Sequence, residues 1–392
     1  MKLYYVNESW THQEEGLVVW GKNHSPLSPS PSTSLLFVNF KKQKGSFIPV
    51  VGILTSDSTS KKFGGNEAAF KRIQLSLQKK GAISYVFSPN GLHPDHVTGY
   101  FYHFQTEKWC EALFPLPNVV YNRIPFRKHE ASIKMEQVKT YLREKDIPYF
   151  NECFFDKDSV YNVLKQDERL IPFLPATRPL LKLDSFTHML TAFNKVYVKP
   201  NKGKKGNGIY VIEGGKKYWQ VHSTKGSIRE VDFSHLLQRW VEPLLTKDYI
   251  IQEAIQPMKW NGSRFDYRVL VHRMRDNLFS LSGIGVRQSG EQEVTTHVPK
   301  GGKIIDVETL PFKEDGPIIE EISHLTGRVL LKHYEHIGEF SMDIGKGKNG
   351  QLYIFEVNSK PMVFDELSIR SLGLENLTDL FLYEAKKSAR SL

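Results

Sequence analysis

The sequence predicts a protein of mixed α/β and α+β class, built from four successive units. Three stretches that differ in their pattern of predicted strands and helices support this class. Short apolar strands fill the first 45 or so residues, strands and helices alternate from there to about residue 155, and strand-rich sequence with few helices follows. The chain has 392 residues, which exceeds the usual size of one hydrophobic core. We therefore expect several compact units that share interfaces.

The first unit, 1–46, is predicted as a small β-rich unit. Its strands are LYYV, GLVVW and SLLFVNF, and SPLSPSPSTS at 25–34 is predicted to be a turn cluster. The second unit, 47–155, begins with the apolar strand FIPVVGILTS. A helix is expected over 66–80, ended by Gly81, before the strand ISYVFSP. The strand VVYNR, a helix over 132–145 and the short strand IPYFN repeat this alternation, which is typical of an α/β layer with parallel strands.

The last two units, 156–245 and 246–392, are predicted as α+β subdomains. A helix begins at 156–158, and the Pro-punctuated segment IPFLPATRPL ends it. Further helices are expected at 234–240 and 318–333, between strands of both subdomains.

The net charge of +10 raises nucleic acids, acidic polymers and phosphorylated ligands as partners. The basic residues are spread along the chain without a block of five or six like charges, which disfavours nucleic acid. The chain has only two cysteines, no apolar run near the roughly 18 residues of a spanning helix, and an N-terminus interrupted by polar residues. We expect an intracellular, cytoplasmic protein without a membrane span.

The segment VYVKPNKGKKGNGIYVIE reads as a Gly-rich hairpin because both flanks alternate as strands. Gly203, Gly206 and Gly208 lie at its tip, and Lys199 lies on the strand before it. Backbone N–H groups at such a tip can approach a polyphosphate, and a lysine can reach a phosphate as a point charge. An ordinary Lys/Gly surface hairpin is the competing interpretation.

A second candidate element is YIIQEAI, an apolar strand that ends in Gln252, Glu253 and Ala254. Such a strand end can offer a purine a backbone donor, a backbone acceptor and an apolar slot, and Glu253 could bind a ribose hydroxyl. A charged strand end that faces water explains Glu253 equally well.

Two arginines lie on the strands RFDYRVLVHR and GIGVRQ. Alternation places Arg268 on the face of its strand that lies away from the apolar core face. It likewise places Arg287 on the other face of its strand from Ile284 and Val286. Two guanidiniums can clamp a phosphate through bidentate hydrogen bonds, although surface salt bridges are the competing interpretation. His297 and Lys300 lie nearby in TTHVPKGGK, where we interpret the histidine as structural and expect that Lys300 could help to close over a substrate.

The segment SMDIGKGKNGQLYIFEVNSKP reads as a hairpin with Asp343 on the incoming strand. On the outgoing strand Glu356 and Asn358 are two residues apart, so they share a face, and pairing can bring Asp343 beside them. Magnesium prefers such oxygen ligands, whereas zinc would favour His or Cys. A solvent-facing polar face is the alternative.

Taken in order, these motifs resemble those of the ATP-grasp superfamily over about 156–365, with DKDSVYNVLKQ resembling its entry helix. FDYRV and FEVNSKP are similar to the branch that includes glutathione synthetase and ribosomal-protein glutamate ligases. The whole chain resembles the YheC/YheD group of endospore-coat-associated proteins. After Asn358 the sequence SKPM replaces a Pro-Gly turn common in relatives.

The resemblance implies two subdomains that grip ATP, preceded by an α/β domain and the small β unit. It implies that ATP phosphates contact Lys157 and Lys199, and that the transferring phosphate meets Arg268 and Arg287. Adenine is implied to lie near Gln252, Glu253, Ala254 and Ile255. The implied metal ion is Mg²⁺, or Mn²⁺ in its place, and its ligands are Asp343, Glu356 and Asn358.

The implied reaction is ATP-dependent joining of a carboxylate to an amine through an acyl phosphate, which needs no protein nucleophile. The resemblance implies a carboxylate and an amine as substrates, without identifying them. It also implies association with the spore coat, with coat proteins as candidate partners. A coat-associated nucleotide-binding or structural protein without ligase activity and an ATP-grasp kinase are the alternatives.

Overall fold

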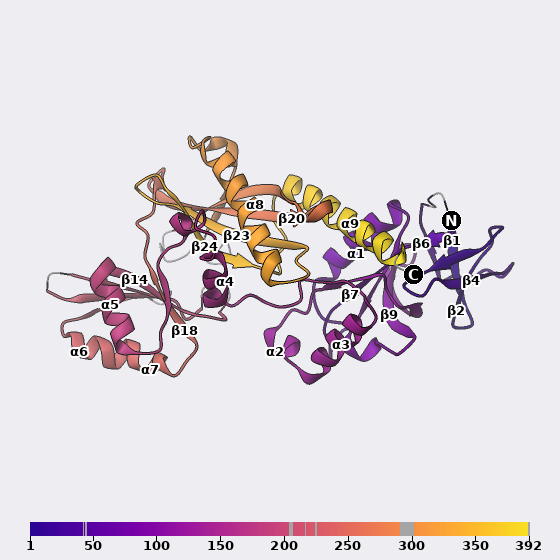
Figure 1. Ribbon diagram of the computed structural model, residues 1–392, viewed down its shortest axis with the longest axis horizontal. Helices are drawn as coiled ribbons and strands as arrows, with labels where there is room; N and C mark the ends of the chain where they lie inside the picture. Colours follow the sequence, from indigo (N-terminus) through magenta and orange to yellow (C-terminus); the bar gives the residue numbers. More distant parts are fainter. Residues whose placement is uncertain are drawn as a thin grey trace.

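A computed structural model of the chain describes residues 1–41, 43, 45–203, 207–215, 217–223, 226–290 and 302–390. These residues form four six-stranded sheets, which lie in a row along an elongated molecule (Figure 1). The row does not follow the chain order. The sheet of the last subdomain lies in the middle, between the α/β layer and the sheet formed by residues 177–253.

The first sheet has the order β5-β1-β2-β4-β3-β6. The prediction of a turn cluster at 25–34 is wrong for its first half, because β4 pairs there with β2 and β3. In this strand the apolar side chain of Leu27 enters the core with 4% of its surface exposed, whereas its neighbours Pro26 and Ser28 are exposed. The strands are β1 (Lys2–Val6), β2 (Ser9–His12), β3 (Val18–Trp20), β4 (Ser25–Pro29), β5 (Phe37–Asn39) and β6 (Phe47–Ile48).

The second sheet has the order β10-β9-β8-β7-β11-β12, and β8, β7, β11 and β12 are parallel as predicted. The predicted helices are confirmed as α1 (Glu67–Lys79), capped by the side chain of Asn66, and α3 (Ile133–Glu144), capped by Ser132. The other elements are β7 (Val50–Leu54), β8 (Ile83–Phe87), η1 (Pro89–Gly91), β9 (His96–His103), β10 (Lys108–Pro115), β11 (Val119–Asn122), α2 (Arg127–Glu130) and β12 (Tyr149–Phe150).

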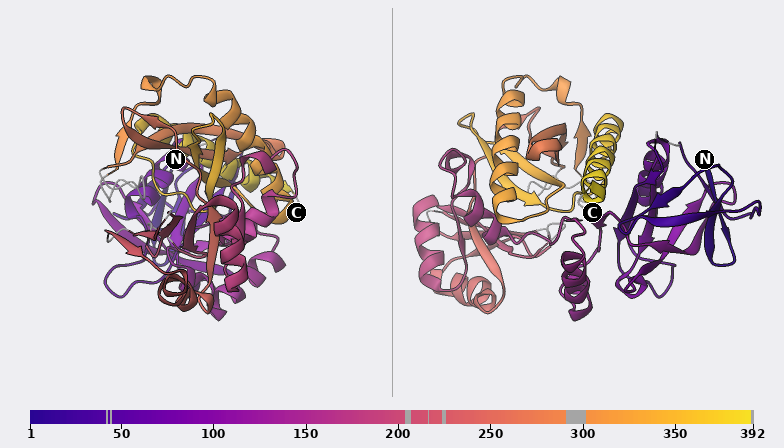
Figure 2. Two further views of the ribbon diagram at one scale, coloured as in Figure 1. Left: turned by 90° about the vertical axis from the view of Figure 1, so that its left-hand side faces the viewer. Right: turned by 45° about the vertical axis from the view of Figure 1, so that its right-hand side comes forward.

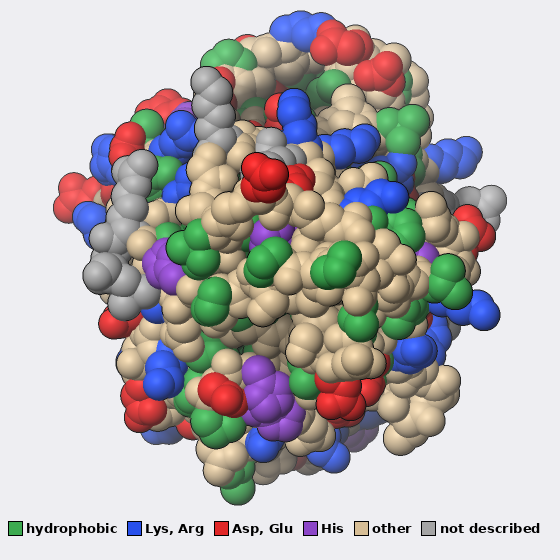
Figure 3. Space-filling model, turned by 90° about the vertical axis from the view of Figure 1, so that its right-hand side faces the viewer, with side chains coloured by type: hydrophobic (Ala, Val, Ile, Leu, Met, Phe, Trp, Pro, Cys, Tyr) green, Lys and Arg blue, Asp and Glu red, His purple; other side chains and the backbone are tan. Residues whose placement is uncertain are grey.

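The first sheet packs against one face of the second. Trp10 lies 5.3 Å from Phe101 and 5.4 Å from Phe114 between ring centroids, and its indole N–H donates to the carbonyl of Leu113 at 2.7 Å. The two units therefore share one apolar core. At this end of the molecule basic and acidic side chains are interspersed rather than gathered by sign (Figure 3).

The third sheet has the order β13-β18-β14-β15-β16-β17. The predicted subdomain boundary at 245/246 falls just before β18, which pairs with β14 in this sheet. The predicted helix at 234–240 is part of a longer helical run. The elements are α4 (Lys157–Leu164), η2 (Ile171–Phe173), β13 (Thr177–Pro179), α5 (Leu183–Phe193), β14 (Lys195–Pro200), β15 (Tyr210–Gly214), β16 (Trp219–Ser223), β17 (Gly226–Glu230), α6 (Phe233–Leu236), η3 (Leu237–Val241), α7 (Glu242–Leu245) and β18 (Tyr249–Glu253).

The fourth sheet runs β22-β21-β20-β23-β24, with β19 beside β20. One face of β20 is buried, with Phe265, Tyr267, Val269 and Val271 each at most 2% exposed, and this core also includes apolar residues of α8. The opposite face carries the candidate site. The elements are β19 (Lys259–Trp260), β20 (Ser263–Arg273), η4 (Arg275–Asn277), β21 (Phe279–Gln288), β22 (Lys303–Ile305), η6 (Val307–Thr309), α8 (Asp315–His333), β23 (Glu339–Lys346) and β24 (Leu352–Asn358).

The sequence did not predict α9 (Leu367–Arg390), which links two sheets that are distant in sequence. It begins over β20 and β21 and continues onto the α/β layer, where it contacts α1 and β11 (Figure 2). Leu377, Phe381 and Ala385 recur every four residues and enter the core that contains Val51 and Tyr121. The helix is therefore held by packing against two units. None of the described helices is long and apolar enough to cross a membrane.

A buried polar cluster also joins these two units. The Glu339 carboxylate accepts hydrogen bonds from the hydroxyl of Tyr121 and from Nη1 of Arg123 at 3.2 Å, and it forms an ion pair with Nε2 of His272 at 3.2 Å. Burial alone would raise the pKa of Glu339, but His272 and Arg123 hold it below its ordinary value. The carboxylate is thus kept charged between the α/β layer and the fourth sheet.

Candidate functional site

The candidate metal ligands lie on one face of the fourth sheet. Asp343 on β23 stands directly opposite Glu356 on β24, and Ser341 stands opposite Asn358. Paired residues on antiparallel strands point to the same side, and residues two apart share that side. Asp343, Glu356 and Asn358 therefore project from the same face.

The two arginines lie on this face as well. Arg268 on β20 stands opposite Asp343 on one side and Gly285 of β21 on the other. Arg287 is two residues from Gly285, so its side chain projects on the same side. The register thus brings all five side chains predicted for the metal and the transferring phosphate onto one surface.

The electrostatics of this surface suit a cation. The pKa of Asp343 is raised to about 6, mainly by burial and also by repulsion from Glu356, while Arg268 opposes the rise. A divalent ion would relieve both the desolvation and the repulsion between the two carboxylates. Among the described residues no three His, Cys, Asp or Glu side chains form a metal cluster, so Asn358 and oxygens from outside the protein would have to complete a coordination shell.

Lys199 reaches this surface from the third sheet. Its Nζ donates to Oε1 of Gln252 at 2.7 Å and to the carbonyl of Phe355 on β24 at 3.4 Å. Gln252 is held in turn by its amide, which donates to Thr177 Oγ1 at 2.8 Å. Burial lowers the pKa of Lys199 to about 8, although Glu356 works in the opposite direction. The buried ammonium therefore sits where the two sheets meet, and Gln252 fixes its position.

Lys157, at the start of α4, is the second lysine at this junction. Its Nζ lies 3.1 Å from Oε1 of Glu356 and donates to the carbonyl of Gly203 at 3.0 Å. It thereby links the candidate metal face to the base of the Gly-rich hairpin. A pocket opens here between α4, β18 and β24. It is lined by Lys157, Val160, Tyr161, Leu164, Leu174, Gln252, Ile354, Phe355, Glu356 and Val357.

The described part of the Gly-rich hairpin shows why glycine is needed at one position. Gly208 has φ +70°, and a Cβ there would lie 2.8 Å from the hydroxyl of Tyr249. Gly203 donates to the carbonyl of Pro200 at 3.3 Å. Gly206 lies outside the described residues, as do His297 and Lys300.

The predicted adenine segment is largely engaged within the protein. The N–H of Glu253 donates to the carbonyl of Ala176 at 2.8 Å, and its Oε2 accepts from the N–H of Ala176 at 3.2 Å. The N–H of Ala254 donates to the carbonyl of Lys195 at 3.1 Å, and Ile255 lies beside Gly347. Glu253 therefore has an internal structural role in addition to the predicted contact with ribose.

Arg287 has acidic partners that sequence reasoning missed. It is 5% exposed and pairs with both oxygens of Glu366, with Nη2–Oε2 at 3.0 Å, and its Nη2 lies 3.5 Å from Asp365. Arg268 lies over the ring of Phe364, 5.3 Å from its centroid. No motif in the sequence links segment 364–366 to arginines on β20 and β21; only the close approach of α9 reveals it.

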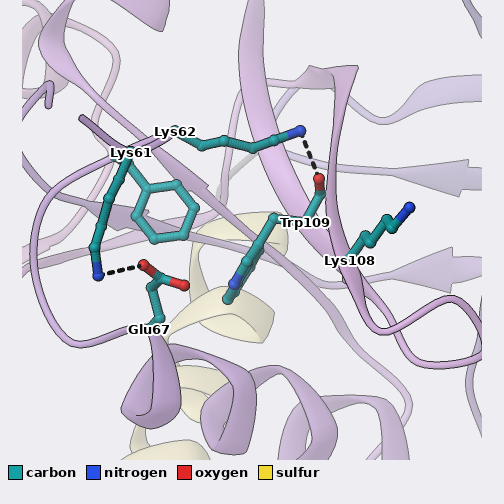
Figure 4. A pocket seen from close by; sticks show the side chains of 6 residues that line it. Lys61, Lys62, Glu67, Lys108 and Trp109 are labelled. Atoms are coloured by element: carbon teal, nitrogen blue, oxygen red, sulfur yellow. Dashed lines mark hydrogen bonds and ion pairs between the residues drawn. The ribbon is translucent and has the colours of Figure 1, made fainter. Parts of the chain in front are cut away.

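A separate pocket of about 460 Å³ lies on the α/β layer (Figure 4). It is lined by Lys61, Lys62, Phe63, Glu67, Lys108 and Trp109. Lys61 pairs with Glu67 at 3.1 Å, and Nζ of Lys62 donates to the carbonyl of Trp109 at 2.7 Å, so two of its lysines are already engaged. It contains none of the predicted site residues, and we place the candidate site at the junction of the third and fourth sheets.

Two sheets joined through a buried lysine, with oxygen-bearing and basic side chains facing the junction, define an ATP-grasp arrangement. A family model described as YheC/D like ATP-grasp matches residues 146–385, and the chain belongs to this family. The predicted fold class, an ATP-grasp fold after an α/β domain and a small β unit, is confirmed.

Two Bacillus subtilis (strain 168) proteins are similar to the chain. Endospore coat-associated protein YheD is 31% identical over 331 residues, covering 80% of this chain and 72% of that protein. Endospore coat-associated protein YheC is 22% identical over 288 residues, covering 70% and 79%. Among solved structures, D-alanyl-alanine synthetase A from Vibrio cholerae aligns with a TM-score of 0.49 and 13% identity, covering 88% of this chain and 99% of that one.

Proposed function

We propose that the protein is an ATP- and Mg²⁺-dependent ligase that joins a carboxylate to an amine. The observation that carries this proposal is the convergence of Lys157, Lys199, Asp343 and Glu356 at the junction of two sheets in a chain of the ATP-grasp family. Two cations and two carboxylates in one partly buried junction suit a nucleotide phosphate chain and its metal.

Each group of site residues has a proposed role in binding ATP, the metal or the transferring phosphate. Lys157 and Lys199 would bind ATP phosphates, and segment 252–255 would lie along the adenine. Asp343, Glu356 and Asn358 would hold Mg²⁺ or Mn²⁺, which when bound supplies charge neutralisation for the phosphates. Arg268 would face the transferring phosphate. Catalysis then consists of positioning and electrostatic stabilisation by charged groups that are held at a partly buried junction.

The proposed reaction has two steps. A carboxylate oxygen of the substrate attacks the γ-phosphorus of ATP, the bond to the β-phosphate oxygen breaks, and ADP leaves. An amine then attacks the carbonyl carbon of the acyl phosphate, inorganic phosphate leaves with the bonding pair, and the amine loses a proton. Neither step requires a covalent bond to the protein, which agrees with a site composed of charged groups.

We further propose a cytoplasmic protein that acts during sporulation and associates with the spore coat, with coat proteins as candidate partners. The names of the two Bacillus subtilis relatives support this location. Imaging a fluorescent fusion in a sporulating host tests it, because signal that never enriches at the forespore surface would contradict the association.

Product analysis decides between ligation and its alternatives. The protein is incubated with ATP, Mg²⁺ and extract of sporulating cells, and mass spectrometry searches for ADP together with a product lighter by one water than the sum of two reactants. A stable phosphoester would instead indicate a kinase. Nucleotide binding by calorimetry without any product from the extract would favour the non-catalytic coat-associated protein.

Protonation of Lys199 gives a separate prediction for ATP binding. Its pKa of about 8 in the free protein should rise when phosphates lie beside it, so binding at pH 8 should take up about half a proton and affinity should fall as the pH rises further. Calorimetry in two buffers of different ionisation enthalpy measures the uptake. Lys199→Met is the control, and uptake that persists unchanged in this variant would assign the proton to another group.

A further inference from the structure

The arginine face contains a small cradle with a carboxylate already in it. Gly285 lies on β21 directly opposite Arg268 and two residues before Arg287. A Cβ on Gly285 would collide with Oε1 of Glu366 and lie 3.1 Å from Nη1 of Arg287. The bare glycine backbone is therefore what gives the Glu366 carboxylate its place beside the two guanidiniums.

The arginines are built to receive an anion at this position. The Arg287 guanidinium pairs with both Glu366 oxygens in the fork geometry typical of carboxylate recognition. Arg268 lies close enough to lower the pKa of Glu366, and its buried Nε has no hydrogen-bond partner among the described residues. A second donor is thus left over on the arginine face after Glu366 is bound.

Glu366 lies where the chain enters α9, at the solvent-facing side of the cradle. It directly precedes α9, and its carbonyl accepts from the N–H of Arg370 at 3.0 Å. Its side chain remains 19% exposed, whereas that of Arg287 is only 6% exposed. The carboxylate is therefore accessible to solvent on one side, whereas the guanidinium is enclosed in the sheet.

We propose that the Gly285 cradle between Arg268 and Arg287 is the site for the substrate carboxylate, and that Glu366 occupies it as an internal placeholder. This inference rests on the proposed ligase function. The placeholder reaches the cradle through two methylenes, so the fitting substrate class is a carboxylate on an unbranched aliphatic stem, as in a glutamate side chain. The substrate would displace Glu366 and inherit its contacts, and Arg287 would never be left as an unpaired buried charge.

Chemical rescue tests the cradle without nucleotide. Glu366→Ala removes the side chain but keeps Arg287, which should lower Tm by roughly 5–10 °C. Propionate carries the missing carboxymethyl group with one further carbon, and it should restore at least half of this loss in a saturable manner. Sodium chloride at equal ionic strength should not. Rescue by neither salt, or equally by both, would overturn the proposal.

Matched variants locate the effect. Glu375→Ala removes an exposed carboxylate from the same helix and should show no response to propionate. The double variant Glu366→Ala with Arg287→Ala should also lose the response, because no buried guanidinium remains to bind the acid. A response that survives in the double variant would place propionate elsewhere and contradict the assignment.

If Glu366→Ala is insoluble, recovery of folded protein on refolding with propionate or chloride replaces the Tm measurement, and equal recovery in both salts overturns the cradle. Because no ATP is present, failed rescue leaves nucleotide binding untouched. Conversely, a protein that shows rescue but binds no ATP would contradict the ligase function and the substrate role, and would leave only a carboxylate-binding cradle.

Discussion

Glu356→Gln is expected to reduce Mg²⁺-supported ATP turnover by at least about 100-fold, because loss of groups that only orient metal ligands already costs about 10- to 100-fold. Glu356 stands opposite Asp343 and pairs with Lys157 at 3.1 Å, so its charge serves both the proposed metal and a phosphate-binding lysine. The measurement is ADP formation against Mg²⁺ concentration with the substrates identified from extract. Calorimetry with Mg²⁺ and ATP then separates weaker binding from slower chemistry.

Glu320→Gln is the matched control, since it makes the same change on the outer part of α8, where the side chain is 59% exposed. It should retain full turnover. Unchanged turnover in Glu356→Gln with a normal Tm would contradict the metal assignment, whereas a loss of Tm shared by both variants would show a general effect on the fold.

Glu339→Ala is expected to destabilise the protein by about 3–5 kcal/mol, the usual cost of removing one partner from a buried ion pair. The substitution would leave Arg123 and His272 facing each other without a carboxylate, and Tyr121 without its acceptor. Scanning calorimetry measures the change. Because these partners come from the α/β layer and the fourth sheet, we expect the transitions of both units to move to lower temperature.

Glu335→Ala provides the comparison, because that side chain lies only a few residues away and is 83% exposed. It should change stability by less than about 0.5 kcal/mol. A similarly small effect of Glu339→Ala would show that the polar cluster is not what joins the two units. Glu339→Gln separates the charge from the packing, since it keeps the side-chain size.

The elements that sequence predicted well carry their signals locally. Helix α1 has a capping residue at Asn66, a glycine stop at Gly81 and a buried apolar stripe, so its ends lie within one residue of the predicted range of 66–80. Strand β4 was missed because its proline and serine residues read as a turn, while the pairing with β2 and β3 that stabilises it comes from residues elsewhere in the chain.

Helix α9 was also missed because its stabilising partners are distant in the sequence. Its apolar residues follow a helical spacing, but the partners that bury them, such as Val51 and Tyr121, lie more than 250 residues earlier in the sequence. The position of Glu366 in the Gly285 cradle depends on this docking. The sequence therefore predicted that Arg268 and Arg287 could clamp a phosphate, but it could not show that Glu366 lies between them.

The sequence by itself determined the order of the motifs, the types of their side chains and the sharing of a face by Glu356 and Asn358, because these follow from the period of a strand. Only the tertiary structure decided that Asp343 and Arg268 stand in one row with Glu356, since strand register includes an irregularity after Asp343. Likewise, only the packing of two sheets brought Lys199 to β24, because contacts between distant segments are set by shared burial rather than by local preference.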